Sequence, residues 1–245
     1  MIVELSIGLA IAIGVFIAIG LKANEAEWGF WLTNVIDGWI RIFCRRYHRQ
    51  SGDQINLPQQ GGVVLVANHI SGLDPFILIT ATKRPLRFLI ALEEYNRFGL
   101  TWLFKLAGCI PVDRSGRVDK AFRFALRAVN SGEVVALFPH GKIYLDHEER
   151  KAIKPGLRKL VEKLKCDVYM ARVTGASVPG EVFSAVIKRG DINLQHFGSL
   201  DHSRFEDSDI NQRIGSLLLG SLPYNHFHQD IDLSQSDYVE RSSTS

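Results

Sequence analysis

Short apolar runs alternate with amphipathic segments through the middle of the chain. The apolar runs, which have the length of buried strands, are VVLVAN (63–68), RFLIAL (87–92), GCIPVD (108–113), EVVALFP (133–139) and DVYMARVTGA (167–176). The segments between them that have a helical pattern are DPFILITATK (74–83), RVDKAFRFALRAVN (117–130) and PGLRKLVEKLK (155–165). Strands that alternate with helices are typical of α/β proteins. We therefore predict an α/β fold with a mixed, mostly parallel central sheet flanked by helices.

The N-terminus has a different pattern. The 17 residues from Leu5 to Leu21 carry no charge, and Ile2 and Val3 extend the run to about the 20 residues that cross a bilayer. A cleavable signal peptide is the alternative, but such a peptide begins with a positively charged region. Here Glu4 is the only charged side chain before the run. We predict that residues 1–22 form a retained transmembrane helix.

The segment NVIDGWIRIFCRRYHRQ (34–50) predicts an amphipathic helix. Five apolar side chains fall on one helical face, and four arginines add positive charge. They are Val35, Ile36, Trp39, Ile40 and Phe43, and Arg41, Arg45, Arg46 and Arg49. A basic amphipathic helix with a tryptophan suits a membrane surface, and an ordinary packing helix is the alternative. Because basic segments next to a membrane helix stay in the cytoplasm, we expect the rest of the chain there.

The C-terminal third is less informative. FSAVIKRGDINLQHF (183–197) predicts a hairpin that turns at residues 189–191, and DSDINQRIGSLLLGSL (207–222) predicts a helix. The domain boundaries that follow from the whole pattern are 1–22 for the anchor, 23–58 for a membrane-surface or linker segment, 59–228 for one globular domain, and 229–245 for a polar tail, which is expected to fray.

Composition limits the classes of function. Of the 245 residues, 46% are hydrophobic and 22% charged, which excludes a disordered protein. A net charge of +3 does not indicate a nucleic-acid partner. The three cysteines, Cys44, Cys109 and Cys166, form no C-x-x-C pair, so neither a disulfide framework nor a zinc site is expected. The sequence also lacks a G-x-S-x-G elbow, a P-loop and a dinucleotide fingerprint.

One polar turn carries candidate chemistry. The apolar run 63–67 stops at Asn68-His69, and the next apolar segment begins at Asp74-Pro75. Asp74 and Pro75 have the residue types of a helix N-cap and a first helical residue. The same spacing also lets the carboxylate of Asp74 reach one imidazole nitrogen of His69, which leaves the other nitrogen as a general base. Capping and catalysis are compatible, because a carboxylate has two oxygens.

This turn, NHISGLD, resembles the N-H-x4-D motif of the glycerolipid acyltransferases, the family that includes the lysophosphatidate acyltransferases. Three later segments, in the family's order, resemble its other blocks: GCIPVDR (108–114), VALFPHGK (135–142) and IKPGLRKLVEKLKCDVYMARVTGA (153–176). The resemblance implies that His69 is the catalytic base and Asp74 its orienting partner. It also implies that Arg114 binds the phosphate of the acceptor, although a solvated turn is the alternative for this residue.

The segment VALFPHGK (135–142), which corresponds to the third block of the family, departs from the family pattern Phe-Pro-Glu-Gly-Thr-Arg. His140 replaces the glutamate, Gly141 is kept, and Lys142 and Ile143 replace the threonine and arginine. We predict that His140, Gly141 and Lys142 take part in acceptor binding, with Lys142 as a point charge. A solvent-facing Lys142 is the alternative.

The resemblance implies an enzyme that transfers a fatty acyl group from a thioester to the hydroxyl of a lysophospholipid, with lysophosphatidate as the leading acceptor. It implies no permanent cofactor or metal, acyl-CoA or acyl-carrier protein as donor, and the lipid bilayer as partner. Glycerol 3-phosphate or an amino-group lipid is an alternative acceptor, and a catalytically weak lipid-binding module is an alternative function. One further apolar segment is RFGLTWLFKLAG (97–108). We interpret it as a second membrane-facing surface or as a cover for the acyl chain, and a buried core helix is the alternative.

Overall fold

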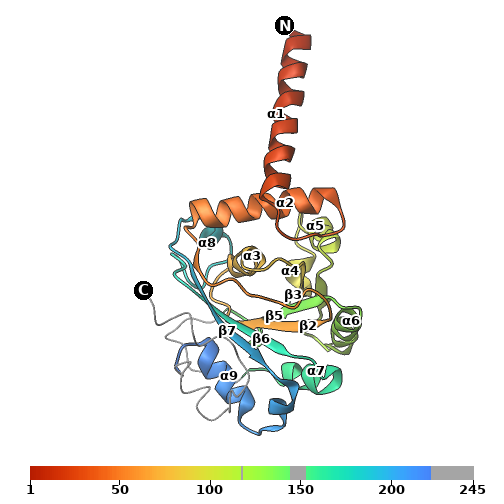
Figure 1. Ribbon diagram of the computed structural model, residues 1–245, viewed down its shortest axis with the longest axis vertical. Helices are drawn as coiled ribbons and strands as arrows, with labels where there is room; N and C mark the ends of the chain where they lie inside the picture. The colour runs from red at the N-terminus through yellow and green to blue at the C-terminus, as the bar shows by residue number, and fades with distance from the viewer. Residues whose placement is uncertain (117, 144–152, 222–245) are drawn as a thin grey trace.

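A seven-stranded sheet lies at the centre of the structure, a computed structural model that describes residues 1–116, 118–143 and 153–221 (Figure 1). The expected polar tail lies outside the described residues. The strands are β1 (Ser51–Gly52), β2 (Val63–Ala67), β3 (Leu86–Ala91), β4 (Ile110–Val112), β5 (Val134–Leu137), β6 (Val168–Thr174) and β7 (Asn193–Leu200). Five of them coincide with the predicted apolar runs.

The order of strands in the sheet is β1-β7-β6-β2-β5-β3-β4. Strands β2 to β6 all run parallel to one another, whereas β7 is antiparallel to β6 and β1 is parallel to β7. The predicted mixed, mostly parallel sheet is therefore confirmed. The predicted hairpin at 183–197 is wrong, because its first arm is a helix, α8 (Phe183–Ile187), and its second arm, β7, pairs with β6.

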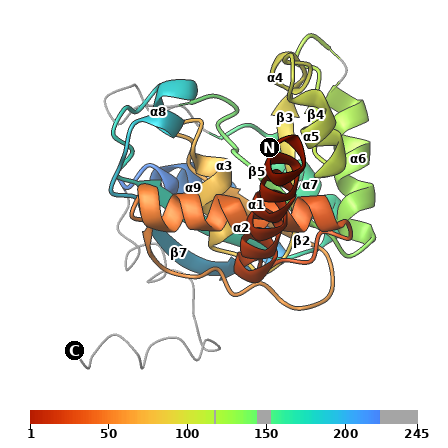
Figure 2. The same ribbon diagram turned by 90° about the horizontal axis from the view of Figure 1, so that it is seen from above.

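Helices cover both faces of the sheet (Figures 1 and 2). One layer contains α2 (Trp31–Ile42), the π-helical turn Phe43–Tyr47 that continues it, α3 (Asp74–Thr80), α4 (Leu92–Tyr95), α5 (Thr101–Leu106) and α8. The other layer contains α6 (Val118–Asn130), α7 (Gly156–Leu164), the 3₁₀ turn His202–Glu206 and α9 (Ile210–Leu218), so the helix predicted within 207–222 is present.

Strand β2 separates two hydrophobic cores. All five of its residues are buried, as expected for a central parallel strand. Val64 and Val66 face the core shared with α6, α7 and α9, whereas Val63, Leu65 and Ala67 face the core shared with α3 and the end of α2. The alternation of side chains along β2 thus fixes the sheet between the two helical layers.

The segment expected to be a linker takes part in the fold. Ser51 and Gly52 form β1, which pairs with Asn193 and Leu194 of β7. Gly52 has a φ of +98°, and a side chain there would overlap the backbone of Leu194, so glycine is required at this close approach. Ile55, which follows, is buried in the core beside α3.

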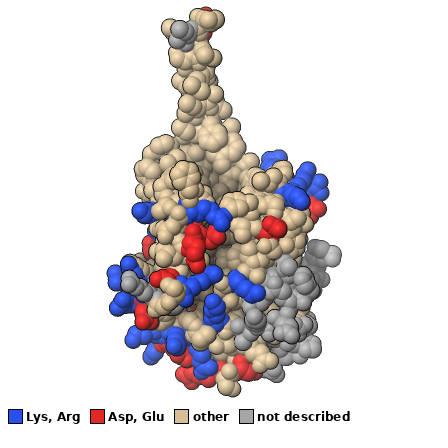
Figure 3. Space-filling view, turned by 180° about the vertical axis from the view of Figure 1, so that it is seen from behind, with Lys and Arg blue, Asp and Glu red and all other residues tan. Residues whose placement is uncertain are grey.

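The N-terminal helix α1 (Ile2–Ala23) stands out from the body of the protein (Figure 1). Its segment Val3–Ala23 has a mean hydropathy of 2.3, and only 6% of the residues in this apolar stretch are buried. It is the single helix among the described residues that is long and apolar enough to cross a membrane. In the view from behind, charged side chains gather on the body and are nearly absent from the projecting helix (Figure 3).

Helix α2 packs across the base of α1 and does not present all its arginines to solvent. Arg41 is only 1% exposed and forms salt bridges with Asp37 and Glu25. Arg45 is partly exposed and also pairs with Glu25. Arg41 therefore adds no positive charge to the surface, because its charge is compensated inside the protein.

Candidate active site

The turn between β2 and α3 begins where β2 leaves the sheet. Asn68, 3% exposed, donates through its side-chain nitrogen to the carbonyl of Val173 at 2.7 Å. Its side-chain oxygen accepts from the backbone N–H of Val173, also at 2.7 Å. The amide thus continues the hydrogen-bonding pattern of β2 with β6 beyond the last paired residues, Ala67 and Ala171. This contact fixes the point at which the chain turns toward His69.

His69 and Asp74 meet as the spacing predicts. Nδ1 of His69 lies 2.8 Å from Oδ2 of Asp74, whose side chain is fully buried. The same oxygen accepts from the backbone N–H groups of Ile70 at 2.7 Å and Ser71 at 2.9 Å. The other oxygen accepts from the hydroxyl of Ser71 at 2.8 Å. These bonds satisfy the buried carboxylate and fix its orientation.

This geometry fixes the tautomer of the neutral imidazole. An ionised carboxylate only accepts hydrogen bonds, so Nδ1 of His69 carries the proton and Nε2 has a lone pair. The side chain of His69 is 21% exposed, whereas its partner is buried. The arrangement is that of a general base whose tautomer is fixed by a buried carboxylate.

The capping role expected of Asp74 is not observed. Leu73 occupies the N-cap position and Asp74 is the first residue of α3, with Pro75 second. The carboxylate receives its backbone hydrogen bonds from the preceding turn, at Ile70 and Ser71, rather than from the helix. Ser71, which is buried, accepts from the N–H of Leu73 through its hydroxyl. Sequence reasoning missed the roles of Ser71 and Asn68, although both lie beside the motif.

An aromatic ring packs on the imidazole. Phe138, just after β5, stacks on His69 with ring centroids 4.1 Å apart and an angle of 11° between the planes. The ring of Phe88, in β3, is nearly parallel to that of Phe138, and the two ring centroids are 6.3 Å apart. Because β5 neighbours β2 in the sheet, the segment FPHGK and the histidine meet at the carboxyl ends of two adjacent strands. Ligands of open α/β sheets bind at this edge.

The third block forms a tight turn after β5. The N–H of Gly141 donates to the carbonyl of Phe138 at 2.9 Å, and Gly141 has a φ of +76°. A side chain at this position would also overlap the end of the Lys154 side chain. Gly141 therefore has a structural reason for its presence, whatever its part in binding an acceptor. Lys142, the next residue, is exposed.

His140 points into the protein. It is 4% exposed, and burial lowers the pKa of its imidazole. Its Nε2 faces Gly215 of α9, since a side chain added there would lie 3.8 Å from that atom. The neutral imidazole is therefore favoured, which disfavours the cationic contact that an anionic acceptor would need. An acceptor-binding role for His140 stays a prediction.

Arg114 lies at the same edge of the sheet as His69 but is not adjacent to it. It follows β4, which is the third strand from β2 in the order β2-β5-β3-β4. At about 4.8 Å per strand, the two chain segments are about 14 Å apart. Arg114 is exposed, so its long side chain can extend across the carboxyl edge. The structure brings His69, Asp74 and the FPHGK turn together and leaves Arg114 at the rim.

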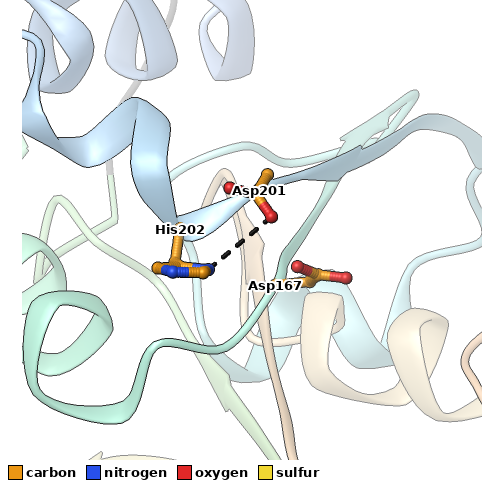
Figure 4. A group of neighbouring side chains, drawn as sticks. All are labelled: Asp167, Asp201 and His202. Carbon is orange, nitrogen blue, oxygen red and sulfur yellow. Dashed lines mark ion pairs between the residues drawn. The ribbon is translucent and has the colours of Figure 1, made fainter. Parts of the chain in front are cut away.

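Asp167, Asp201 and His202 form a group of possible metal ligands at the opposite end of β6 (Figure 4). Their ligand atoms lie within 4.8 Å of one another. Asp201 accepts from the N–H of Ser203 at 2.8 Å and so begins the 3₁₀ turn His202–Glu206. Partial desolvation, reinforced by the charge of Asp201, raises the pKa of Asp167, although its side chain is exposed. Helix capping explains Asp201, and we assign no ion to this group.

Comparison with known proteins matches residues 48–174 to the acyltransferase family. This region contains the turn of His69 and Asp74, the segment that ends at Arg114, and the FPHGK turn. The chain belongs to the acyltransferase family. The family suggested by the motifs is therefore confirmed, and the departures at His140 and Lys142 are variations within it.

Individual relatives extend this assignment. The chain is 29% identical over 121 residues to a probable 1-acyl-sn-glycerol-3-phosphate acyltransferase of Mycoplasma genitalium, a match that covers 46% of this chain and 44% of that protein. It is 32% identical over 103 residues to the protein of the same name from Mycoplasma pneumoniae, covering 38% and 37%. The match to N-acylphosphatidylethanolamine synthase of Arabidopsis thaliana is 26% over 111 residues, covering 41% and 39%. The acyltransferase thus matches less than half of the length of these relatives.

A solved structure supports the fold over a longer range. The 1-acyl-sn-glycerophosphate (LPA) acyltransferase of Thermotoga maritima superposes with a TM-score of 0.60 over 85% of this chain and 86% of its own, at 15% identity. At that identity the likeness establishes the fold of the acyltransferase.

Proposed function

We propose that this acyltransferase moves a fatty acyl group from an acyl thioester to the free hydroxyl of lysophosphatidate. The observation that carries the proposal is the hydrogen bond between Nδ1 of His69 and the buried carboxylate of Asp74, which leaves Nε2 as a base. Two relatives named as probable 1-acyl-sn-glycerol-3-phosphate acyltransferases support this choice of acceptor. The donor is acyl-CoA or acyl-carrier protein, which the reaction consumes as a substrate.

The proposed reaction needs no covalent acyl-enzyme. Nε2 of His69 removes the proton of the acceptor hydroxyl while that oxygen attacks the thioester carbonyl carbon. Asp74 stabilises the imidazolium that forms, as the carboxylate does in a Ser-His-Asp triad. The tetrahedral intermediate then collapses with cleavage of the carbon–sulfur bond, and the imidazolium returns its proton to the departing thiolate. The products are a new ester and a free thiol.

Recognition of the acceptor head group is assigned to exposed cations at the carboxyl edge. Arg114 follows β4 and Lys142 follows β5. Both strands lie on the same side of β2 in the sheet, and both residues are exposed. Arginine binds phosphate with two parallel donors, whereas lysine contributes a point charge. A phosphate held between the two side chains would direct the hydroxyl of the acceptor toward His69.

We further propose that α1 anchors the acyltransferase in a membrane as a single span, with the globular part in the cytoplasm. The length and hydropathy of Val3–Ala23 and its protrusion from the body support the anchor. Arg45 and Arg46, beyond the end of α2, support the cytoplasmic orientation. The acceptor and the product both reside in the bilayer, so attachment confines the enzyme to the surface that holds its substrate.

Activity is tested with the purified full-length protein, labelled acyl-CoA or acyl-carrier protein, and a panel of lysolipids. Lysophosphatidate should be converted to its diacyl product, and His69→Ala should abolish the reaction. His202→Ala is the matched control, because this histidine lies at the opposite end of β6 from the site. Absence of transfer to every lysolipid from either donor would overturn the proposal.

An amino-group lipid is a second candidate acceptor. The match to N-acylphosphatidylethanolamine synthase favours it, as does the changed third block, in which the usual glutamate and arginine are replaced by His140 and Ile143. Including phosphatidylethanolamine in the same panel distinguishes the two. An N-acylated product in place of phosphatidate would assign the amine as nucleophile, with the same base.

Topology is tested separately from activity with an impermeant thiol reagent on intact cells. Glu4→Cys marks the start of α1, and Lys163→Cys marks exposed α7 on the globular part. The expected result is labelling at position 4 and protection at position 163 until the cells are opened. Labelling at position 163 in intact cells would reverse the proposed orientation.

A further inference from the structure

Large apolar side chains are exposed on the layer of the protein that carries the candidate active site. Helix α5 has the sequence TWLFKL, yet none of its residues is buried, and Trp102 is 54% exposed. Phe98, just before it, is fully exposed. On α8, Phe183 and Ile187 are also exposed, at 55% and 70%. The buried core helix considered for this apolar segment is therefore excluded, and the exposed surface needs another partner.

The two groups of apolar side chains are neighbours. The guanidinium of Arg97 lies 4.6 Å above the centre of the Phe183 ring and so connects the loop before α5 with α8. The loop before α8 also contacts the turn of the catalytic pair, because the N–H of Gly180 donates to the carbonyl of Ile70 at 2.8 Å. In addition, the N–H of Gly72 donates to the backbone carbonyl of Glu181 at 3.1 Å. The exposed apolar surface therefore borders His69.

This surface is continuous with the proposed anchor. The hydroxyl of Tyr47 donates to the carbonyl of Ile187, and Nε2 of His48 lies 3.0 Å from the carbonyl of Val186. These bonds join α8 to the end of α2, which packs against α1. Figures 1 and 2 show α2, α4, α5 and α8 on the side of the sheet from which α1 rises. A bilayer that contains α1 therefore lies on the same side as the exposed apolar residues.

The charges near these residues suit a phospholipid surface. Arg97 and Lys105 flank Phe98 and Trp102, and Lys188 and Arg189 follow α8 directly. Exposed aromatic side chains beside lysine and arginine are characteristic of segments that lie in a bilayer interface. Basic residues at this depth are attracted to anionic lipid head groups.

We propose that Phe98, Trp102, Phe183 and Ile187 form a lipid-contact rim, which inserts into the interface of the same bilayer that holds α1. The inference rests on the proposed anchoring of α1 and adds a second point of contact with the bilayer. With the rim inserted, the turn of His69 faces the bilayer surface. The hydroxyl of a lysolipid can then reach the imidazole while its acyl chain stays among the lipids.

Insertion is measured with a fluorescent probe on cysteines introduced one at a time into the full-length protein in phosphatidylcholine–phosphatidylglycerol vesicles. Phe98→Cys and Ile187→Cys report on the rim, Ile13→Cys reports on α1, and Phe124→Cys is the matched control. Phe124 is an exposed phenylalanine of α6, on the other layer. Labelling at neutral pH favours the introduced cysteine, because burial raises the pKa of Cys44 to about 12 and those of Cys109 and Cys166 to about 11.

Nitroxide groups on shallow positions of the lipid acyl chains should quench the probe at 98 and 187. Nitroxide groups near the ends of the acyl chains should quench the probe at 13, which lies in the middle of α1, and neither set should affect the probe at 124. Quenching at 13 without quenching at 98 and 187 overturns the rim and retains the anchor. Absence of quenching at 13 as well overturns both. If the rim binds a second copy or another protein, positions 98 and 187 also remain unquenched, so that outcome counts against the proposal.

A kinetic measurement gives a second readout. The variant Phe98→Ser/Ile187→Ser should lower kcat/KM at least tenfold for a long-chain lysolipid in vesicles, because each substitution removes a large apolar contact with the bilayer. With a short-chain lysolipid that dissolves in water, kcat/KM should be unchanged. Equal losses for the two acceptors would mean that the substitutions disturb the site itself, and the rim would be rejected. The quenching experiment needs no activity, so it is decisive even if the proposed reaction is not found.

Discussion

Arg41 of α2 donates a hydrogen bond of 3.2 Å to the carbonyl of Thr80, the last residue of α3. It also donates to the carbonyl of Thr82 at 2.9 Å. The first residue of α3 is Asp74, so one end of this seven-residue helix is held by α2 and the other end contacts His69. The cation also lies at the end of α3 where the helix dipole is negative.

Replacing Arg41 should destabilise the fold far more than replacing its neighbour. Arg41→Gln leaves the fully buried carboxylate of Asp37 without its cation, and removal of one partner of a buried pair costs about 3–5 kcal/mol. Arg45 is 38% exposed, so Arg45→Gln should cost less than about 1 kcal/mol. Denaturant unfolding of the full chain in detergent measures both free energies. Equal values would show that the Arg41 network contributes no more than a surface pair.

The variant Asp74→Asn should stay folded and lose most of its turnover. Asparagine has the same shape, and its oxygen can accept from Ile70 and Ser71 while its amide faces the hydroxyl of Ser71. The negative charge that is proposed to stabilise the imidazolium is lost, however, and a hydrogen bond to a charged group contributes roughly 1.5–3 kcal/mol. The expected fall in kcat is therefore about ten- to a hundredfold, measured beside a circular dichroism spectrum. Full activity in this variant would reduce Asp74 to a residue that shapes the turn.

Substitution of the exposed cations should change affinity for the acceptor alone. Arg114→Ala and Lys142→Ala each remove a charge assigned to the acceptor phosphate, which should raise the acceptor KM about ten- to a hundredfold. The KM for the acyl donor should change little. Lys163→Ala, an exposed lysine on α7, is the matched control. A donor KM that rises as much as the acceptor KM would reassign the two cations to the thioester.

Stability should decrease as the pH is lowered from about 7 to 5. Burial holds the pKa values of His48, His140 and His196 below the ordinary value. Below about pH 6.5 the unfolded chain binds protons that these imidazoles do not bind in the fold, so the free energy of unfolding falls until the pH reaches their lowered pKa values. The variant His140→Gln removes one of the three and should show a shallower decrease in denaturant titrations.

The same His140→Gln protein tests the acceptor role predicted from the sequence. If a protonated His140 binds the acceptor, the acceptor KM of the parent enzyme rises with pH and the variant loses that dependence. If His140 is a buried neutral residue, the two enzymes share one pH profile of KM. The burial of the side chain favours the second outcome.

The sequence predicts the parts of the fold that depend on local periodicity. The runs around Val64 and Val135 are buried on both faces, and continuous apolar runs of that length are typical of central parallel strands. The segment 183–187 was misassigned, because five residues are too few to distinguish a strand from a helix. Its apolar side chains Phe183 and Ile187 are exposed. The segment therefore shows neither the helical nor the strand pattern of apolar residues that face a core.

The pairing of His69 with Asp74 was also predictable, since both residues lie in one turn. Contacts made through tertiary structure were not. Phe138 stacks on His69 because β5 lies beside β2 in the sheet. The spacing of residues along the chain does not predict the order of strands in a sheet. The burial of Arg41 depends on Glu25 and Thr80, which only the packing of α2 on α3 brings together.

The bond between Asn68 and Val173 sets an order of events during protein synthesis. The two residues are 105 positions apart, and β2 completes its pairing only when β6 has been made. At about 5–20 residues per second, a ribosome needs about 5–20 s to add that intervening chain. Helix α1 leaves the ribosome well before then. A nascent chain therefore exposes the apolar helix α1 well before β6 can complete the sheet beside the turn of His69.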